Sequence, residues 1–173
     1  MQLSAAVRTA TGYTGCMGRS EFVLQRVQPA LIGLIDGSMS TLAPIFAVAI
    51  ATQVTRYAFL AGVATSIAAG ISMAYSEGLS DTGELTGRGN PVTRGIITGV
   101  GTFLGGILHT LPFLIPTYHV ALVAACVVVA FELVGLAWLR YRFLGTGFLR
   151  SVAHITLGGT VIVAVSAALG AAG

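Results

Sequence analysis

The sequence contains few charged residues and no lysine. Only 9% of its 173 residues are charged, whereas about a quarter are charged in an ordinary soluble domain. All nine basic residues are arginine, and 55% of the residues are apolar. This composition excludes an ordinary soluble domain and predicts an integral membrane protein.

Motifs of several function classes are also missing. The two cysteines, Cys16 and Cys126, lie far apart and form no disulfide or zinc-binding pattern. We find no nucleophile with a neighbouring base, no phosphate-binding loop and no histidine-rich motif, so we expect no enzyme. The formal net charge of +3 says little about partners, and nothing supports nucleic-acid binding. Residues 1–18 lack the apolar core of a signal peptide, so we expect no cleavage.

The apolar residues fall into five blocks, each of about the length that a helix needs to cross a bilayer. The blocks cover residues 29–53, 57–79, 95–115, 118–139 and 151–172. We therefore predict an all-α integral membrane protein with five transmembrane helices, which forms a transport domain over residues 29–173. Residues 1–28 form a leader, in which residues 20–28 are either a short amphipathic helix at the membrane interface or a linker.

Arginine placement predicts the orientation of the chain. In a five-span arrangement Arg56 alone lies on one side, and all other arginines lie on the opposite side. Because cytoplasmic segments are enriched in arginine and lysine, the N-terminus is expected in the cytoplasm and the C-terminus outside. Arginine without lysine, with much glycine and alanine, suggests a bacterial genome of high GC content and hence the bacterial inner membrane.

Two carboxylates interrupt the first two apolar blocks. Asp36 and Met39 are spaced i, i+3 in the first block, and Met73 and Glu77 are spaced i, i+4 in the second. A rise of about 1.5 Å per residue predicts that all four side chains share one layer. Oxygen and thioether ligands together suit a borderline divalent ion such as Fe²⁺. Ordinary packing of the methionines and an arginine partner for Glu77 are the open alternatives.

Further polar residues are secondary candidates for this metal site. Asp81 and Glu84 extend an acidic stripe from Glu77 if the second helix continues, and otherwise lie in a solvated loop. Glu132 in the fourth block either supports the site and relays protons or pairs with an arginine. His109 in the third block is an exit ligand, a proton acceptor or a contact between helices. Pro44 should break the first helix and free the carbonyl of Ser40.

The motif at residues 36–41, Asp-Gly-Ser-Met-Ser-Thr, together with the motif at residues 70–77, Gly-Ile-Ser-Met-Ala-Tyr-Ser-Glu, resembles the vacuolar iron transporter family. The surrounding sequence, with Leu-Thr-Gly-Arg-Gly at residues 85–89 and His-Thr-Leu-Pro-Phe-Leu-Ile-Pro at residues 109–116, looks most like the membrane half of bacterial membrane-bound ferritins. The likeness covers about residues 26–172.

The resemblance implies a homodimer that moves Fe²⁺, and also Mn²⁺ or Co²⁺, out of the cytoplasm in exchange for protons, with no permanently bound cofactor. Asp36 and Met73 match the family's metal positions, and Glu77 matches its acidic motif. The dimer would form through the first span, where Gly33 and Gly37 permit close approach. The chain lacks the long glutamate-rich segment of the eukaryotic members and the di-iron domain of the membrane-bound ferritins.

Two other functions fit the same residues. The chain is alternatively a membrane anchor or docking subunit for a ferritin-like iron protein, with no transport of its own. A passive channel is the third reading, and it differs from an exchanger because it needs no proton gradient.

Overall fold

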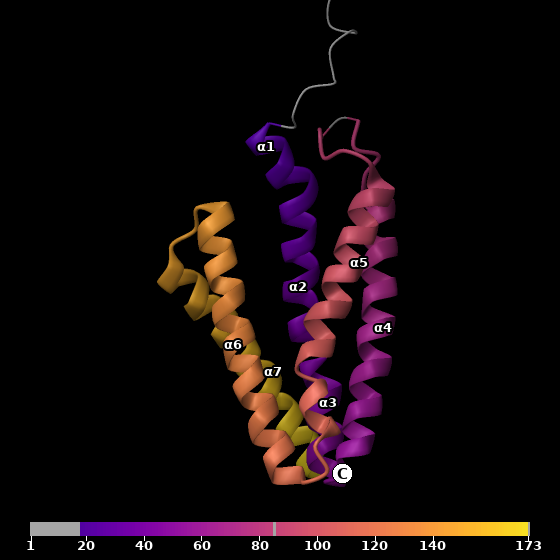
Figure 1. Cartoon of the computed structure of the whole chain (residues 1–173), viewed down its shortest axis with the longest axis vertical. Helices are drawn as coiled ribbons and strands as arrows, with labels where there is room; N and C mark the ends of the chain where they lie inside the picture. The colour runs from indigo at the N-terminus through magenta and orange to yellow at the C-terminus, as the bar shows by residue number, and fades with distance from the viewer. Residues whose placement is uncertain (1–17, 85, 173) are drawn as a thin grey trace, which may run out of the picture.

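The computed structural model describes residues 18–84 and 86–172, and within these residues it contains helices and no strands. Five helical stretches are long and apolar enough to cross a membrane (Figure 1). The all-helical class and the five spans are therefore confirmed, and the helices are those of an integral membrane protein. Which membrane surrounds them is not shown.

The first span is one helical stretch from Arg19 to Thr52. It consists of α1 (Arg19–Phe22), a π-helical turn η1 (Val23–Val27), α2 (Gln28–Ser40) and α3 (Leu42–Thr52). Residues 20–28 are helical and not a linker. They continue directly into α2 and are not a separate helix at the membrane interface. The residue between α2 and α3, Thr41, is the break that Pro44 predicts.

The remaining spans are α4 (Thr55–Ser80), α5 (Pro91–Leu108), α6 (Tyr118–Leu144) and α7 (Phe148–Ala172), with a short 3₁₀ helix η2 (Leu111–Leu114) before α6. The third span begins earlier than predicted because Asn90 caps it, with its side chain accepting a hydrogen bond from the Thr93 backbone N–H. It also ends earlier, at Leu108, since the prolines that follow cannot continue an α-helix.

Small residues let α5 pack closely between α2 and α4 (Figure 1). A Cβ atom at Gly33 or Gly37 of α2 would overlap the backbone of Thr98 or Thr102 of α5. The expected role of these two glycines at a homodimer interface is therefore wrong in this structure, because α5 of the same chain already occupies their face. A homodimer stays a prediction, and it would have to use another surface.

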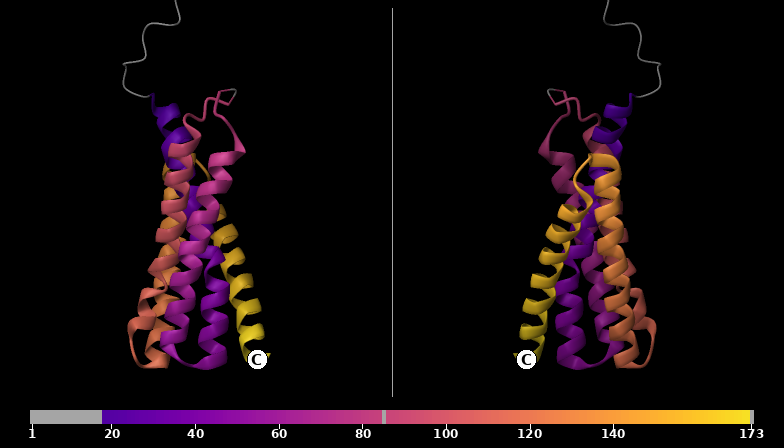
Figure 2. Two further views of the ribbon diagram at one scale, coloured as in Figure 1. Left: turned by 90° about the vertical axis from the view of Figure 1, so that its right-hand side faces the viewer. Right: turned by 90° about the vertical axis from the view of Figure 1, so that its left-hand side faces the viewer.

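The two halves of the first span have different neighbours. The upper half, α2, packs mainly against α5, whereas α3 packs against α7 and α4. The hairpin of α6 and α7 contacts α2 only sparsely. Figure 2 shows that the described chain begins and ends at opposite ends of the bundle, as five spans require. The side on which each end lies remains a prediction from the arginines.

Candidate functional site

The break in the first span exposes backbone groups inside the apolar bundle. Pro44 has no N–H, so the carbonyl of Ser40 has no helical partner four residues later. Thr41 is fully buried, and its hydroxyl donates a 2.7 Å hydrogen bond to the carbonyl of Gly37. The side chain of Thr41 therefore holds the end of α2 in place at the break.

A chain of hydrogen bonds leads from Thr41 across three helical spans. Its hydroxyl lies 2.7 Å from Nε2 of His109, which directly follows α5. Nδ1 of His109 lies 2.9 Å from Oε2 of Glu132 on α6, and Oε1 of Glu132 accepts a 3.2 Å hydrogen bond from Ser38 of α2. The side chain of His109 is 0% exposed and that of Glu132 is 11% exposed. A polar chain buried in this way is costly within a membrane, so it is the candidate functional site of the bundle.

The chain joins side chains that can each carry or pass on a proton. Thr41 has one hydroxyl proton and two partners, the carbonyl of Gly37 and Nε2 of His109, both at 2.7 Å. Ser38 likewise has one hydroxyl proton and two partners, the carbonyl of Leu34 at 2.8 Å and Oε1 of Glu132 at 3.2 Å. The tautomer of His109 decides which way the hydrogen bonds of Thr41 run.

Two hydrogen-bond arrangements of Thr41 fit these distances. With a proton on Nε2 of His109, the hydroxyl of Thr41 accepts from Nε2 and donates to the carbonyl of Gly37. Without a proton on Nε2, the hydroxyl donates to Nε2 and its hydrogen bond to Gly37 is lost. The hydrogen bond from Thr41 to Gly37 is thus linked to the proton on His109.

Asp36 lies next to the carbonyl that this rearrangement would free. Its side chain is partly exposed, and within the described residues it forms neither a hydrogen bond nor an ion pair. Met39, one turn further along α2, packs against α7, where its Cε atom lies 3.2 Å from the Cβ position of Gly158. Met39 thus has the packing role that was its open alternative, at the edge of the hydrophobic core.

Glu77 is held by arginine side chains. It forms ion pairs with Arg88, at 3.1 Å, and with Arg94, which is 1% exposed and also pairs with Asp81 at 3.4 Å. On α5, Gly95 contacts the turn of α4 that carries Glu77. The arginine pairing that was left open for Glu77 is therefore the arrangement in the structure.

The predicted common layer of four side chains is wrong for Glu77. On α5, Gly95 contacts the turn of α4 next to Glu77, and Thr102 contacts the turn of α2 next to Asp36. Seven residues at about 1.5 Å per residue separate these two levels by about 10 Å. Met73 lies one turn of α4 below Glu77 and is half-buried, which puts it nearer to the level of Asp36.

The secondary candidates do not form an acidic stripe. The second span ends at Ser80, and Asp81 has an extended backbone, with φ −165° and ψ 134°. The Asp81 carboxylate accepts hydrogen bonds from the Gly83 backbone N–H and the Thr86 hydroxyl, and Glu84 is exposed. The loop interpretation of these residues is therefore correct. Of the two alternatives for Glu132, the arginine pairing is not found among the described residues, because its oxygens lie against His109 and Ser38.

Within residues 18–84 and 86–172, no three histidine, cysteine, aspartate or glutamate side chains come together as a metal-binding group. The structure therefore divides the predicted acidic metal ligands into two groups, which the sequence alone did not distinguish. Asp36 stays in the span without a partner, whereas Glu77 and Asp81 belong to an arginine cluster near the membrane surface. The residues that sequence reasoning missed are Ser38 and Thr41, whose only signal was their position just before the break.

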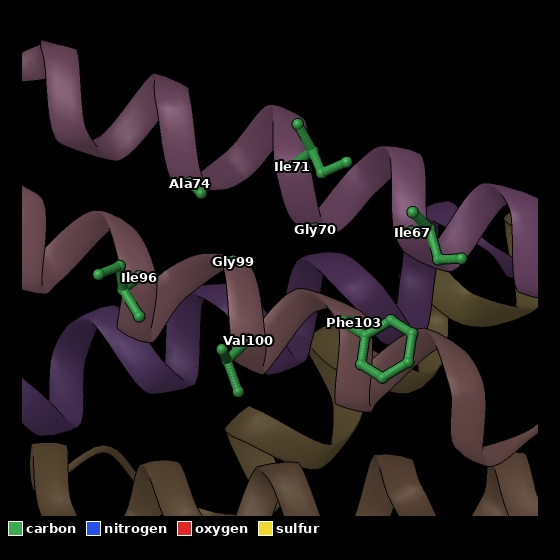
Figure 3. Close-up of a pocket in the computed structure, with 8 residues that line it drawn as sticks. All are labelled: Ile67, Gly70, Ile71, Ala74, Ile96, Gly99, Val100 and Phe103. Atoms are coloured by element: carbon green, nitrogen blue, oxygen red, sulfur yellow. The ribbon is translucent and has the colours of Figure 1, made fainter.

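An open apolar groove of about 350 Å³ runs along the outer face of α4 and α5 (Figure 3). It is lined by Ile67, Gly70, Ile71, Ala74, Ile96, Gly99, Val100 and Phe103. These residues offer no ionisable or polar side chain, so the groove has no means to bind an ion. It is a surface for lipid chains or for another apolar helix.

Comparisons of this chain with protein-family models, with curated proteins and with solved structures find no match. The resemblance to the vacuolar iron transporter family therefore stays a prediction that depends on the two motifs quoted above.

Proposed function

We propose that this chain exports a divalent transition-metal ion from the cytoplasm in exchange for protons, with Fe²⁺ as the first substrate and Mn²⁺ and Co²⁺ as others. One observation carries the proposal: a buried His109–Glu132 pair lies in hydrogen-bond contact with Thr41 at a break in a membrane span. Buried ionisable pairs of this kind are typical of proton relays in transporters.

We assign binding of the transported metal ion to Asp36. Among the carboxylates within the described spans, it alone has neither a hydrogen bond nor an ion pair. A divalent ion needs such a free oxygen, and the thioether of Met73 supplies a preference for borderline and soft ions, whereas Met39 packs against α7. Glu77 and Asp81 are not assigned to the ion, because Arg88 and Arg94 neutralise them at the arginine-rich end that we assign to the cytoplasm.

The proposed coupling passes through the break. Release of the proton from the His109–Glu132 pair turns the hydroxyl of Thr41 away from the carbonyl of Gly37. That carbonyl oxygen lies next in the chain to Asp36, so proton release adds a free oxygen where the ion is to bind. Proton uptake restores the hydrogen bond and removes that oxygen, which favours release of the ion.

The test is transport into proteoliposomes by the purified chain, with Fe²⁺ or Mn²⁺ outside, and a metal-sensitive and a pH-sensitive dye inside. Asp36→Asn should abolish metal flux, and Asp36→Glu should retain part of it. Glu132→Gln cannot release its proton and should abolish the pH change that accompanies metal entry. Glu84→Gln, the same chemical change on an exposed loop, is the matched control and should behave as the wild type.

The outcomes separate the alternatives. Unchanged metal flux in Asp36→Asn would remove that residue from the pathway. Metal flux without any dependence on a proton gradient would replace the exchanger by a passive channel. Absence of flux by the folded, purified chain would favour a membrane anchor for a ferritin-like iron protein.

A further inference from the structure

Five arginines at one end of the bundle have no acidic partner within ion-pair distance among the described residues. They are Arg19, Arg26, Arg140, Arg142 and Arg150. The other two described arginines at this end, Arg88 and Arg94, are neutralised by Glu77 and Asp81. The excess positive charge therefore lies at the start of the first span and around the connection between α6 and α7.

Two open grooves lie between these two groups of arginines. One, of about 810 Å³, is lined by Arg19, Ser20, Val23, Leu24 and Gln28 of the first span and by Phe143 and Leu144 of α6. The other, of about 300 Å³, lies beside it and is lined by Phe22, Arg26, Val27, Ala30, Leu31, Leu34, Leu139 and Phe143. The larger groove has both polar and apolar surface and includes Arg19, whereas the smaller one is apolar throughout. Together they match a phospholipid, which has a charged headgroup and apolar acyl chains.

One residue that lines the larger groove has a buried polar atom without a hydrogen-bond partner. It is Gln28, whose Oε1 atom is an acceptor. A buried acceptor that stays unpaired costs about 1–3 kcal/mol. The larger groove thus has an arginine, Arg19, and an acceptor that lacks a donor.

We propose that this groove binds an anionic phospholipid whose headgroup carries hydroxyl groups, as phosphatidylglycerol does. The phosphate would accept from Arg19 and the neighbouring arginines, and a headgroup hydroxyl would donate to Oε1 of Gln28. Phosphatidylcholine has no donor for Gln28, and the headgroups of phosphatidylcholine and phosphatidylethanolamine carry no net charge, so the arginines attract them less than they attract an anionic headgroup. The acyl chains lie along Leu31, Leu34 and Leu139.

Trp138 provides the measurement, because it is the single tryptophan of the chain and directly precedes the groove residue Leu139. The full chain is reconstituted in phosphatidylcholine vesicles that contain a fixed small fraction of either brominated phosphatidylglycerol or brominated phosphatidylcholine. Bromine quenches tryptophan fluorescence at short range. We expect stronger quenching by the brominated phosphatidylglycerol, and we expect the difference to shrink as salt is added.

Substitutions assign the preference to the groove. Arg19→Gln together with Arg26→Gln should weaken the relative association of phosphatidylglycerol by about fivefold for each arginine removed. Arg19→Lys with Arg26→Lys should keep it, which excludes a folding defect as the cause. Arg56→Gln, at the opposite end of the bundle, is the matched control and should leave it unchanged. Equal quenching by both lipids, or a preference that survives in the double glutamine variant, overturns the proposal.

Discussion

Removal of Arg94 should destabilise the fold because it leaves acidic groups without their buried partner. Arg94 is 1% exposed and contacts both Glu77, which is 11% exposed, and Asp81, which is 18% exposed. Breaking a buried ion pair from one side typically costs about 3–5 kcal/mol. Glu77 keeps Arg88 as a second partner at 3.1 Å, so we expect Arg94→Met to cost about 3 kcal/mol, the lower end of that range.

A double-mutant cycle tests the contact itself. Unfolding in mixed detergent micelles, followed by circular dichroism, is compared for Arg94→Met, Glu77→Gln and the double variant. The free energy of unfolding of the double variant should fall by less than the sum of the decreases in the two single variants. We expect a coupling energy of about 2 kcal/mol. Arg56→Met is the control, and as an exposed arginine without an ion pair it should cost less than about 0.5 kcal/mol. Additive losses would show that Arg94 does not hold Glu77, and would return Glu77 to the metal site.

Three further predictions concern other contacts. Gly37→Ala should cost about 1–3 kcal/mol in the same unfolding assay, because the new methyl group overlaps a carbonyl oxygen of α5. The hydroxyl of Thr86 lowers the pKa of Asp81, so this bond stabilises the fold above about pH 4 and is lost as the pH falls through the lower pKa of the folded chain. Melting temperatures of the wild type and Asp81→Asn should therefore converge in acid. His109→Phe should cost about 1–3 kcal/mol, because Glu132 loses its buried partner, and should abolish proton movement in the transport assay.

The fold was largely predictable because a bilayer imposes simple conditions on a sequence. Apolar length alone located five spans, and proline chemistry located the break before Pro44. The ends of the third span were missed by several residues, because a cap at Asn90 and the 3₁₀ turn before Pro116 depend on local hydrogen bonds rather than on hydropathy.

The site was predicted only in part, for reasons of helix rotation and partner choice. Spacing within one helix placed Met39 beside Asp36, but it could not show that Met39 faces α7. Glu77 finds its arginine 17 residues further along the chain, and Glu132 finds His109 on a different helical segment. Such pairings depend on how the helices are rotated relative to one another. The periodicity of a single helix gives no information about this rotation.

The break at Thr41 also divides the first span between two sets of neighbours. α2 packs mainly against α5, whereas α3 packs against α7 and α4, and α4 also packs along α5. In the proposed exchange, the hydrogen bond from Thr41 to Gly37 would form in the protonated state and be lost in the other. A proton held between His109 and Glu132, 2.9 Å apart, would then act at the position where the first span changes its neighbours.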